Sequence, residues 1–382
     1  MPDRESLFVK FIETRLEQTL FRSLIPVEHS AGPELQIQGK AYINFSGNDY
    51  LGLSQSPKLL EQAFLYATEH GVGAGASRLV TGNLTCFDKI EQKIAKLKNK
   101  PAALLMASGF QVNAGVLHAL FDKSVHGVAP LVYADRLNHA SMHFGCAAAQ
   151  VRQIRYRHLD IDHLAELLEK NKETEIPRFI LTETVFSMDG DIAPMDDICT
   201  LAEKYNCLVI CDDAHATGIL GDGGSGLSGD ADIVIGTCSK ALGSFGAFVA
   251  CSKTIQHYLI NRCAGFIYST ALSPVVLGAI DAALEILPDL DEARAHVVNI
   301  ASTFCEKAQQ KGYDTGKSQS QIVPVIIGDA DKALLLSQKM KDNGFWVSAI
   351  RPPTVPKGTA RLRFTFCAYH TKDHVDDVVG VL

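Results

Sequence analysis

Short apolar runs alternate with stretches of helical periodicity along most of this 382-residue chain, and this alternation constrains its fold more than any other feature. The runs span 102–107, 130–135, 178–184, 207–213, 231–237 and 246–252. Several have no polar face, as is typical of strands covered by helices on both sides of a sheet. The intervening helical stretches span 110–121, 141–149, 160–170 and 194–206. This pattern predicts an α/β protein with a mostly parallel central sheet flanked by helices.

The two ends of the chain depart from this alternation. Apolar residues recur every four positions near the N-terminus, at Phe8, Ile12, Leu16, Leu20 and Leu24. This spacing predicts an amphipathic helix that packs as an arm on the body of the protein and stops at the following proline, residue 26.

After about residue 270 the chain changes to two long helical stretches and then to strands around one helix. The helical stretches span 275–287, 291–311 and 330–342, and the strands span 322–328 and 361–367. A chain of this length also exceeds the usual size of one hydrophobic core. We therefore expect an N-terminal helical arm (1–40), a large domain (41–270) and a smaller C-terminal α+β domain (271–382).

The composition excludes several classes of protein. With 47% hydrophobic and 21% charged residues, the chain is neither disordered, collagen-like nor a coiled coil. A net charge of −7 without basic clusters argues against nucleic-acid binding. No apolar run approaches the roughly 18 residues that a membrane span requires, and the N-terminal segment resembles neither a secretory signal nor a transit peptide. Ten cysteines without a CxxC pair indicate reduced thiols, so we expect a cytoplasmic protein.

Polar side chains gather where the predicted strands end. These residues are Ser108, His139, Glu183, Ser187, Asp212, Asp213, His215, Thr237 and Lys240. Ligands of parallel α/β sheets bind at the carboxyl ends of the strands, so we expect one composite site there. A carboxylate that ends an apolar strand, such as Asp212 or Asp213, usually has a cationic partner.

Simpler explanations exist for individual members of this set. Ser108 and Gly109 form a pair that suits a helix cap, and a single lysine such as Lys240 is most often a surface residue. His139 and His143 are four residues apart, but no third ligand stands at metal spacing, so we expect no metal site.

Two further motifs fail in their context. The segment 189–191 resembles the start of a calcium loop but lacks the glycine that the loop requires. The segment 71–77 fits a loose dinucleotide fingerprint, but it follows a helical stretch rather than a strand, which argues against NAD.

The composite site as a whole suits pyridoxal 5'-phosphate (PLP). A lysine can form a Schiff base, a carboxylate such as Asp212 can keep the pyridine nitrogen protonated, and a helix N-terminus can hold a phosphate. His215 can hydrogen-bond the phenolic oxygen, and His139 can lie on the ring face. Ser108, Gly109 and Thr237 can hold the phosphate. A substrate carboxylate also needs an arginine, for which Arg361 and Arg363 are candidates.

The chain resembles the α-oxoamine synthase family of fold-type I PLP-dependent enzymes from about residue 20 to residue 382. The motifs that carry this resemblance are NFSGNDYLGL (44–53), GAGASRLVTGN (73–83), ASGFQVN (107–113), ADRLNHAS (134–141), TETVFSMDGDIAPM (182–195), DDAHATG (212–218), TCSKALGSFG (237–246), IYSTALSP (267–274) and IRPPTVPKGTARLRFT (350–365). The sequence departs from the family at Thr184 and Ala216, where glycine is usual and where the larger side chains could tighten the pocket.

The resemblance implies a role for each candidate residue. Lys240 matches the Schiff-base lysine, Asp212 the pyridine-nitrogen aspartate, His215 the phenolic-oxygen histidine and His139 the ring-stacking histidine. Gly109, Phe110, Ser187 and Thr237 match positions that contact the cofactor. Arg22 and Thr354 match contacts of the acyl substrate, and Arg363 matches the arginine that binds the amino-acid carboxylate.

The stretch IRPPTVP (350–356) favours one branch of this family. The resemblance implies that this branch condenses L-alanine with a pimeloyl thioester, on coenzyme A or acyl carrier protein, with loss of CO2, in biotin biosynthesis. It also implies a homodimer. Two alternatives remain open: a branch that uses glycine and acetyl-CoA, and a non-catalytic subunit of a heterodimer, against which the intact Lys240, Asp212, His215 and His139 argue.

Overall fold

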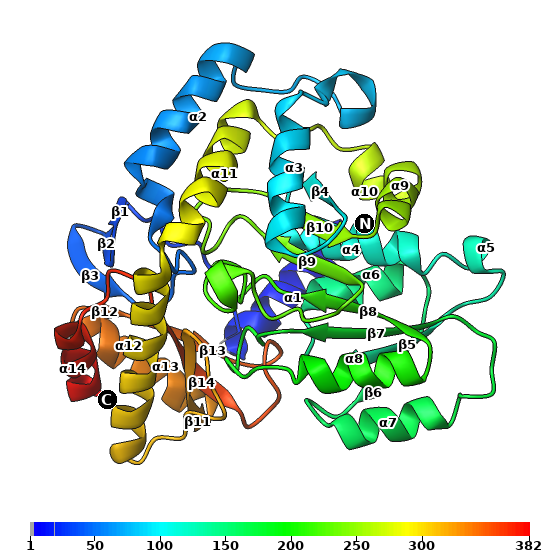
Figure 1. Ribbon diagram of the computed structural model, residues 1–382. Coiled ribbons are helices and arrows are strands. Elements are labelled where there is room, and N and C mark those ends of the chain that lie inside the picture. Colours follow the sequence, from blue (N-terminus) through cyan, green and yellow to red (C-terminus); the bar gives the residue numbers. More distant parts are fainter. Residues whose placement is uncertain (1–3, 19) are drawn as a thin grey trace.

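The computed structural model describes residues 4–18 and 20–382 (Figure 1). A seven-stranded sheet lies at its centre, in the order β4-β10-β9-β8-β7-β5-β6. Its strands are β4 (Ala102–Met106), β5 (Leu131–Asp135), β6 (Gln153–Tyr156), β7 (Arg178–Glu183), β8 (Cys207–Asp212), β9 (Ile233–Thr237) and β10 (Ala247–Cys251). Six of them run in the same direction, and only β10 is antiparallel to its two neighbours, which confirms the mostly parallel sheet.

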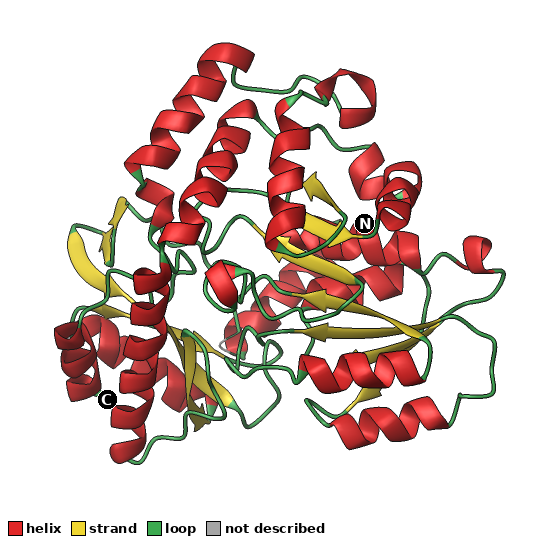
Figure 2. Ribbon diagram, in the orientation of Figure 1, coloured by secondary structure: helices red, strands yellow, loops and turns green. Residues whose placement is uncertain are grey.

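Helices cover both faces of this sheet (Figure 2). The helices of this part of the chain are α2 (Pro57–His70), α3 (Cys86–Leu97), α4 (Gly109–Leu120), α5 (Lys123–His126), α6 (Ala140–Ala148), α7 (Ile161–Glu169), α8 (Met195–Lys204), α9 (Lys253–Arg262), α10 (Ala264–Ile267) and α11 (Pro274–Ile286). The short helices 53–55, 78–82, 222–224 and 287–289 complete this part of the chain.

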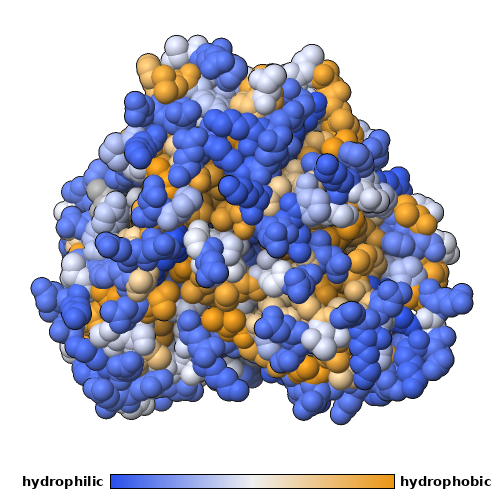
Figure 3. All heavy atoms as spheres, in the orientation of Figure 1, coloured by the Kyte–Doolittle hydropathy of each residue, from blue (hydrophilic) through white to orange (hydrophobic). Residues whose placement is uncertain are grey.

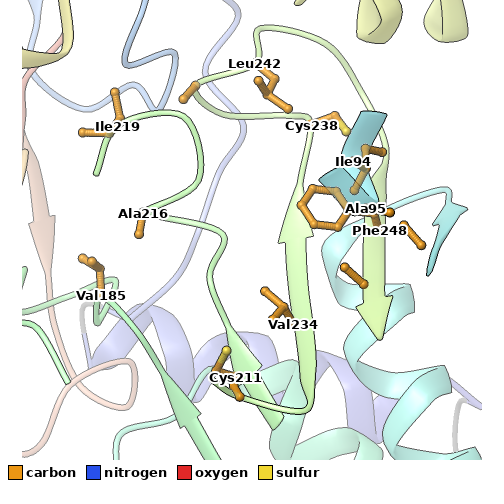
Figure 4. Packing of buried hydrophobic residues seen from close by; sticks show 14 of the residues in the cluster. Ile94, Ala95, Val185, Cys211, Ala216, Ile219, Val234, Cys238, Leu242 and Phe248 are labelled. Atoms are coloured by element: carbon orange, nitrogen blue, oxygen red, sulfur yellow. The ribbon is translucent and has the colours of Figure 1, made fainter. Parts of the chain in front are cut away.

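Successive residues of each strand pack on opposite faces of the sheet, as strand geometry requires. In β8, Ile210 packs in one hydrophobic cluster, while Val209 and Cys211 pack in another. Figure 4 shows part of the second cluster, in which Phe248 of β10 lies beside Ile94 and Ala95 of α3. Because both faces of the strands are buried, their sequences read as continuous apolar runs.

The N-terminal helix differs from its prediction. Helix α1 (Ser6–Glu17) ends before Leu20, and none of its described residues is buried. The expected extension to Leu24 was therefore wrong. The expected packing on the body is only partial among the described residues, since Phe11, Ile12 and Arg15 line a surface hollow with Pro353. Leu20 and Leu24 continue the four-residue spacing of apolar positions outside the helix. Apolar side chains reach the surface in several places among the hydrophilic ones (Figure 3).

A smaller sheet and its helices form most of the C-terminal part. Its strands, in the order β11-β14-β13, are β11 (Ile322–Gly328), β13 (Ser348–Ile350) and β14 (Ala360–Thr365). Its helices are α12 (Asp291–Gln310), α13 (Ala330–Asp342) and α14 (Lys372–Val381). The expected strands and helices of this region are confirmed.

An early segment of the chain joins this part. Strands β1 (His29–Ala31), β2 (Glu34–Ile37) and β3 (Lys40–Asn44) form a sheet with β12 (Phe345–Trp346). Phe45 packs in the same cluster as Phe364 and Phe366. The division of the chain into domains at residues 40 and 270 remains a proposal. The pairing of β3 with β12 shows in addition that residues 29–45 lie with the C-terminal part. None of the described helices is long and apolar enough to cross a membrane.

Candidate active site

Three neighbouring strands bring their last residues to one edge of the central sheet. Glu183 ends β7, Asp212 ends β8 and Thr237 ends β9. Glu183 and Asp212 are directly paired in the register of the two parallel strands. The predicted gathering of polar residues at the carboxyl ends of the strands is therefore present.

Asp212 is buried and held by two donors. The side-chain amide of Asn113, on α4, donates to Asp212 Oδ2 over 2.6 Å, and the backbone N–H of Ala214 donates to Oδ1 over 3.0 Å. Asn113 also donates to the Ser141 hydroxyl, which lies 2.6 Å from Nδ1 of His139. These contacts fix the carboxylate and place the exposed His139 ring in the same network.

Lys240 lies against His215. Its Nζ atom is 2.8 Å from His215 Nε2, and burial lowers the pKa of Lys240 to about 8, although the charge of Asp212 opposes this shift. A lysine with this pKa exists partly as the neutral amine near pH 7, which is the nucleophilic form.

His215 is an uncharged imidazole in this setting. Burial of the ring holds its pKa well below the usual range, and the positive charges of Lys240 and Arg363 lower it further. Its Nδ1 atom lies 2.7 Å from the hydroxyl of Tyr50, which donates to Asn48 Oδ1 over 3.1 Å. One ring nitrogen can thus donate a hydrogen bond and the other can accept one.

The residues predicted to hold a phosphate lie around the start of α4. Ser108 is the N-cap of this helix and accepts a hydrogen bond from the backbone of Gln111 over 3.3 Å, so its capping explanation is correct. The space beside Gly109 is open, since a Cβ atom there would meet nothing within 4 Å. Phe110, 49% exposed, follows it.

Thr237 reaches the same edge of the sheet. It pairs with Ala247 of β10, which in turn pairs with Met106 at the end of β4. Adjacent strands lie about 4.8 Å apart, so Thr237 is about 10 Å from the strand that leads into α4. Its hydroxyl lies 2.7 Å from that of Ser239.

Arg363, rather than Arg361, faces the candidate site. The Nε atom of Arg363 donates to the backbone oxygen of Ser187 over 2.5 Å, and its terminal nitrogens each lie 3.4 Å from Asn48 Oδ1. Arg361 forms an ion pair with Asp189 at 2.5 Å and also donates to the backbone oxygen of Met188, so it is used to hold this loop.

Arg22 and Thr354 meet across 332 positions of the chain. Arg22 Nη2 donates to the Thr354 hydroxyl over 3.3 Å. They line a cavity of about 260 Å³ together with Arg15, Leu20 and the segment 349–353. Ala349 and Ile350 of this cavity belong to β13, where they pair with Leu362 and Arg361 of β14, the strand that also carries Arg363.

The two departures from the family pattern have structural explanations. The Thr184 hydroxyl donates to Asp213 Oδ1 over 2.6 Å. Ala216 is fully buried in a hydrophobic cluster (Figure 4). Asp213 also has the cationic partner that its position in the sequence predicted, since Lys98 Nζ lies 2.5 Å from Oδ2.

Comparison with known proteins identifies the family. The model of the aminotransferase class I and II family matches residues 40–382. The chain belongs to this family. An 8-amino-7-oxononanoate synthase from Gluconacetobacter diazotrophicus is 47% identical over 98% of this chain and 96% of that protein. One from Geobacter sulfurreducens is 39% identical over 96% of this chain and 94% of that protein.

Solved structures of the family share the fold. A serine palmitoyltransferase of S. paucimobilis with bound PLP has a TM-score of 0.91 at 27% identity, covering 99% of this chain and 97% of that one. An 8-amino-7-oxononanoate synthase from Francisella tularensis has a TM-score of 0.77 at 28% identity, covering 89% and 96%. The architecture is therefore that of the fold-type I PLP-dependent transferases, as expected.

The candidate site residues of this chain provide the chemical groups that binding of PLP requires. They provide an amine at Lys240, a carboxylate at Asp212, a helix N-terminus with open space beside Gly109, and hydroxyl groups at Thr237 and Ser239. Sequence reasoning assigned no role to Asn113 or Tyr50, although both lie in family motifs. Their contacts join segments far apart in the chain, so only the fold reveals them.

Proposed function

We propose that this chain is an 8-amino-7-oxononanoate synthase of biotin biosynthesis. It condenses L-alanine with a pimeloyl thioester and releases CO2 and the free thiol. Relatives that carry this name match nearly the whole chain at 39% and 47% identity. Within the structure, the observation that carries the proposal is the contact of Arg22 with Thr354 at a cavity that adjoins strand β13, since a pimeloyl chain ends in a second carboxylate.

The enzyme uses PLP, which when bound supplies an electron sink for negative charge at the substrate Cα atom. The Asp212 carboxylate would keep the ring nitrogen protonated, and His215 would hydrogen-bond the phenolic oxygen. His139 would stack on the ring. Ser108, Gly109, Phe110, Ser187 and Thr237 would hold the rest of the cofactor.

Lys240 both holds the cofactor and moves the proton. Its Nζ atom would hold the cofactor through its aldehyde, and the free amine at this position would take the Cα proton of alanine. The lowered pKa of about 8 supports this role, because a neutral amine is available near physiological pH. His215, whose Nε2 atom lies 2.8 Å from Nζ, is neutral, so it adds no positive charge that would make the amine a weaker base.

Two arginines orient the substrates. Arg363 binds the carboxylate of alanine, held in place by Ser187 and Asn48. Arg22 and Thr354 bind the far carboxylate of the pimeloyl chain. An acetyl group has no charge to offer this second site, which favours the pimeloyl thioester over acetyl-CoA.

The enzyme forms a homodimer in the cytoplasm. The exposed aromatic side chains of Phe110, Phe144, Phe245 and Tyr268, which are 49%, 56%, 52% and 84% accessible, support an assembly that covers them. Helix α1 adds Leu7 and Phe8 to the exposed apolar surface.

One assay tests the proposed function. The purified protein is given L-alanine or glycine with pimeloyl-CoA, pimeloyl-acyl carrier protein or acetyl-CoA, and the products are identified by mass spectrometry. We expect 8-amino-7-oxononanoate from alanine and a pimeloyl thioester. Turnover of glycine with acetyl-CoA alone would assign the chain to the other branch, and absence of cofactor absorbance at about 420 nm would indicate a non-catalytic subunit.

A further inference from the structure

A second carboxyl group lies beside Asp212. Glu183 ends β7 where Asp212 ends β8, and the two residues are paired in register. Residues Leu181 and Ile210, two positions earlier on each strand, pack in the same hydrophobic cluster, so Glu183 and Asp212 alternate to the same face of the sheet. Neighbouring strands lie about 4.8 Å apart, which brings the two carboxyl groups close together.

The two carboxyl groups are treated differently by their surroundings. Asp212 accepts hydrogen bonds from the Asn113 amide and the Ala214 N–H. Glu183 is only 2% exposed, and its Oε1 atom has no hydrogen-bond partner among the described residues. Two buried carboxylates this close cannot both ionise without a large energetic penalty, and the better-solvated one keeps the charge.

The electrostatic surroundings of Glu183 also favour its uncharged form. Burial raises the pKa of Glu183 well above its usual range, and the charge of Asp212 raises it further. Lys240 and the backbone N–H groups of His139 and Ser187 oppose this shift. His139 and Ser187, whose backbone N–H groups lie near the Glu183 carboxyl group, are both candidate cofactor contacts, so this carboxyl group lies at the site.

We propose that Glu183 is a positioning residue of this site that stays uncharged in the folded protein, so that Asp212 alone carries the negative charge of the pair. The inference rests on the proposed function. Its consequence concerns Lys240, because a second negative charge at this edge would raise the pKa of the amine and keep it protonated. A neutral Glu183 thereby preserves the free amine that removes the Cα proton.

The first test uses the protein without cofactor, so it is independent of activity. Unfolding in urea is measured between about pH 5 and pH 8 for the wild type and for Glu183→Gln, whose amide has the shape of the neutral acid. A glutamate in an unfolded chain ionises near pH 4.3, so folding must take up a proton above that pH. We expect the unfolding equilibrium constant of the wild type, relative to the variant, to rise about tenfold per pH unit.

The exposed Glu203 on α8 provides the matched control. Glu203→Gln should leave the corresponding ratio flat across this pH range. A flat ratio for Glu183→Gln as well would show that Glu183 is ionised in the folded protein and would overturn the inference. Failure of Glu183→Gln to fold would also overturn it, since the amide preserves the size, the acceptor and the donor of the neutral acid.

The second test reads the charge at the site with the cofactor bound. The pH dependence of the absorbance at about 420 nm reports the pKa of the lysine-bound cofactor. Glu183→Gln should leave this pKa unchanged within about 0.3 unit, whereas loss of a carboxylate charge would lower it by about one unit. If the alanine and pimeloyl assay fails while both results hold, the charge assignment survives and the proposed substrates do not.

Discussion

Replacement of Lys98 should destabilise the protein severely. The Lys98 and Asp213 side chains are both fully inaccessible to solvent, and their charged atoms are 2.5 Å apart. Lys98 Nζ also donates to the Thr217 hydroxyl over 2.7 Å and to the Ser225 backbone oxygen over 2.5 Å. Lys98→Met therefore leaves a buried carboxylate without its counter-charge, which costs about 3–5 kcal/mol.

The remaining donors to Asp213 limit this loss. The Thr184 and Thr217 hydroxyls and the backbone N–H of Leu227 still bind its carboxylate in the variant. We therefore expect a decrease near the lower end of the range, about 3 kcal/mol, in the free energy of unfolding by urea at pH 7. Because this pair ties the end of α3 to the segment that follows Asp212, cofactor affinity should fall as well.

Two comparisons isolate the ion pair. Lys172→Met breaks the exposed pair with Glu169, in which both side chains are 49% accessible, and should change stability by less than about 1 kcal/mol. The double variant Lys98→Met/Asp213→Asn removes the stranded charge and should recover at least about half of the loss. A loss of less than about 1 kcal/mol in Lys98→Met, or no recovery in the double variant, would refute this reasoning.

Three further predictions follow from the site and its supports. Arg22→Ala should raise KM for the pimeloyl thioester by the equivalent of about 1.5–3 kcal/mol while KM for alanine is unchanged. If the variant and the wild type have the same KM for the pimeloyl thioester, Arg22 is a solvent-exposed cation that does not bind this substrate. Asp212→Asn should keep the fold but slow exchange of the alanine Cα proton, measured by NMR in D2O, at least about a hundredfold, and near-normal exchange would contradict its role. His158 lies between Asp135 and Asp191 at 3.0 and 2.9 Å; although burial opposes it, these hydrogen bonds raise the pKa of His158 to about 9. The protonated His158 stabilises the fold fully below about pH 6.5, and this stabilisation is lost as the pH rises through 9. Over this range the free energy of unfolding of the wild type should therefore fall by up to about 3 kcal/mol more than that of His158→Asn.

Long elements with clear periodicity could be predicted closely from the sequence. The helical stretch 275–287 corresponds to α11 (Pro274–Ile286), and 330–342 coincides with α13. Their apolar positions are packed as the spacing requires. Strand β6 (Gln153–Tyr156) was missed because it is a short edge strand that is only partly buried, so its sequence is neither apolar nor alternating. The antiparallel direction of β10 was missed because the periodicity of a strand carries no direction.

The candidate site was predictable where it follows from the topology of the sheet. The polar residues at the strand ends meet because parallel strands end at one edge. The partners that orient them were not predictable in this way. Asn113 reaches Asp212 across 99 positions, and Lys98 reaches Asp213 across 115. Arg361 and Arg363 share one face of β14, and only the position of Asp189 shows which of them is already paired.

The role of Lys240 is the central claim, and one measurement tests it directly. Borohydride reduction of the protein with bound PLP, followed by proteolysis and mass spectrometry, identifies the lysine that carries the cofactor. We expect the reduced cofactor on the peptide that contains Lys240, because this amine has a lowered pKa and lies beside His215 at the edge of the sheet. A label on any other lysine would contradict this account of the active site.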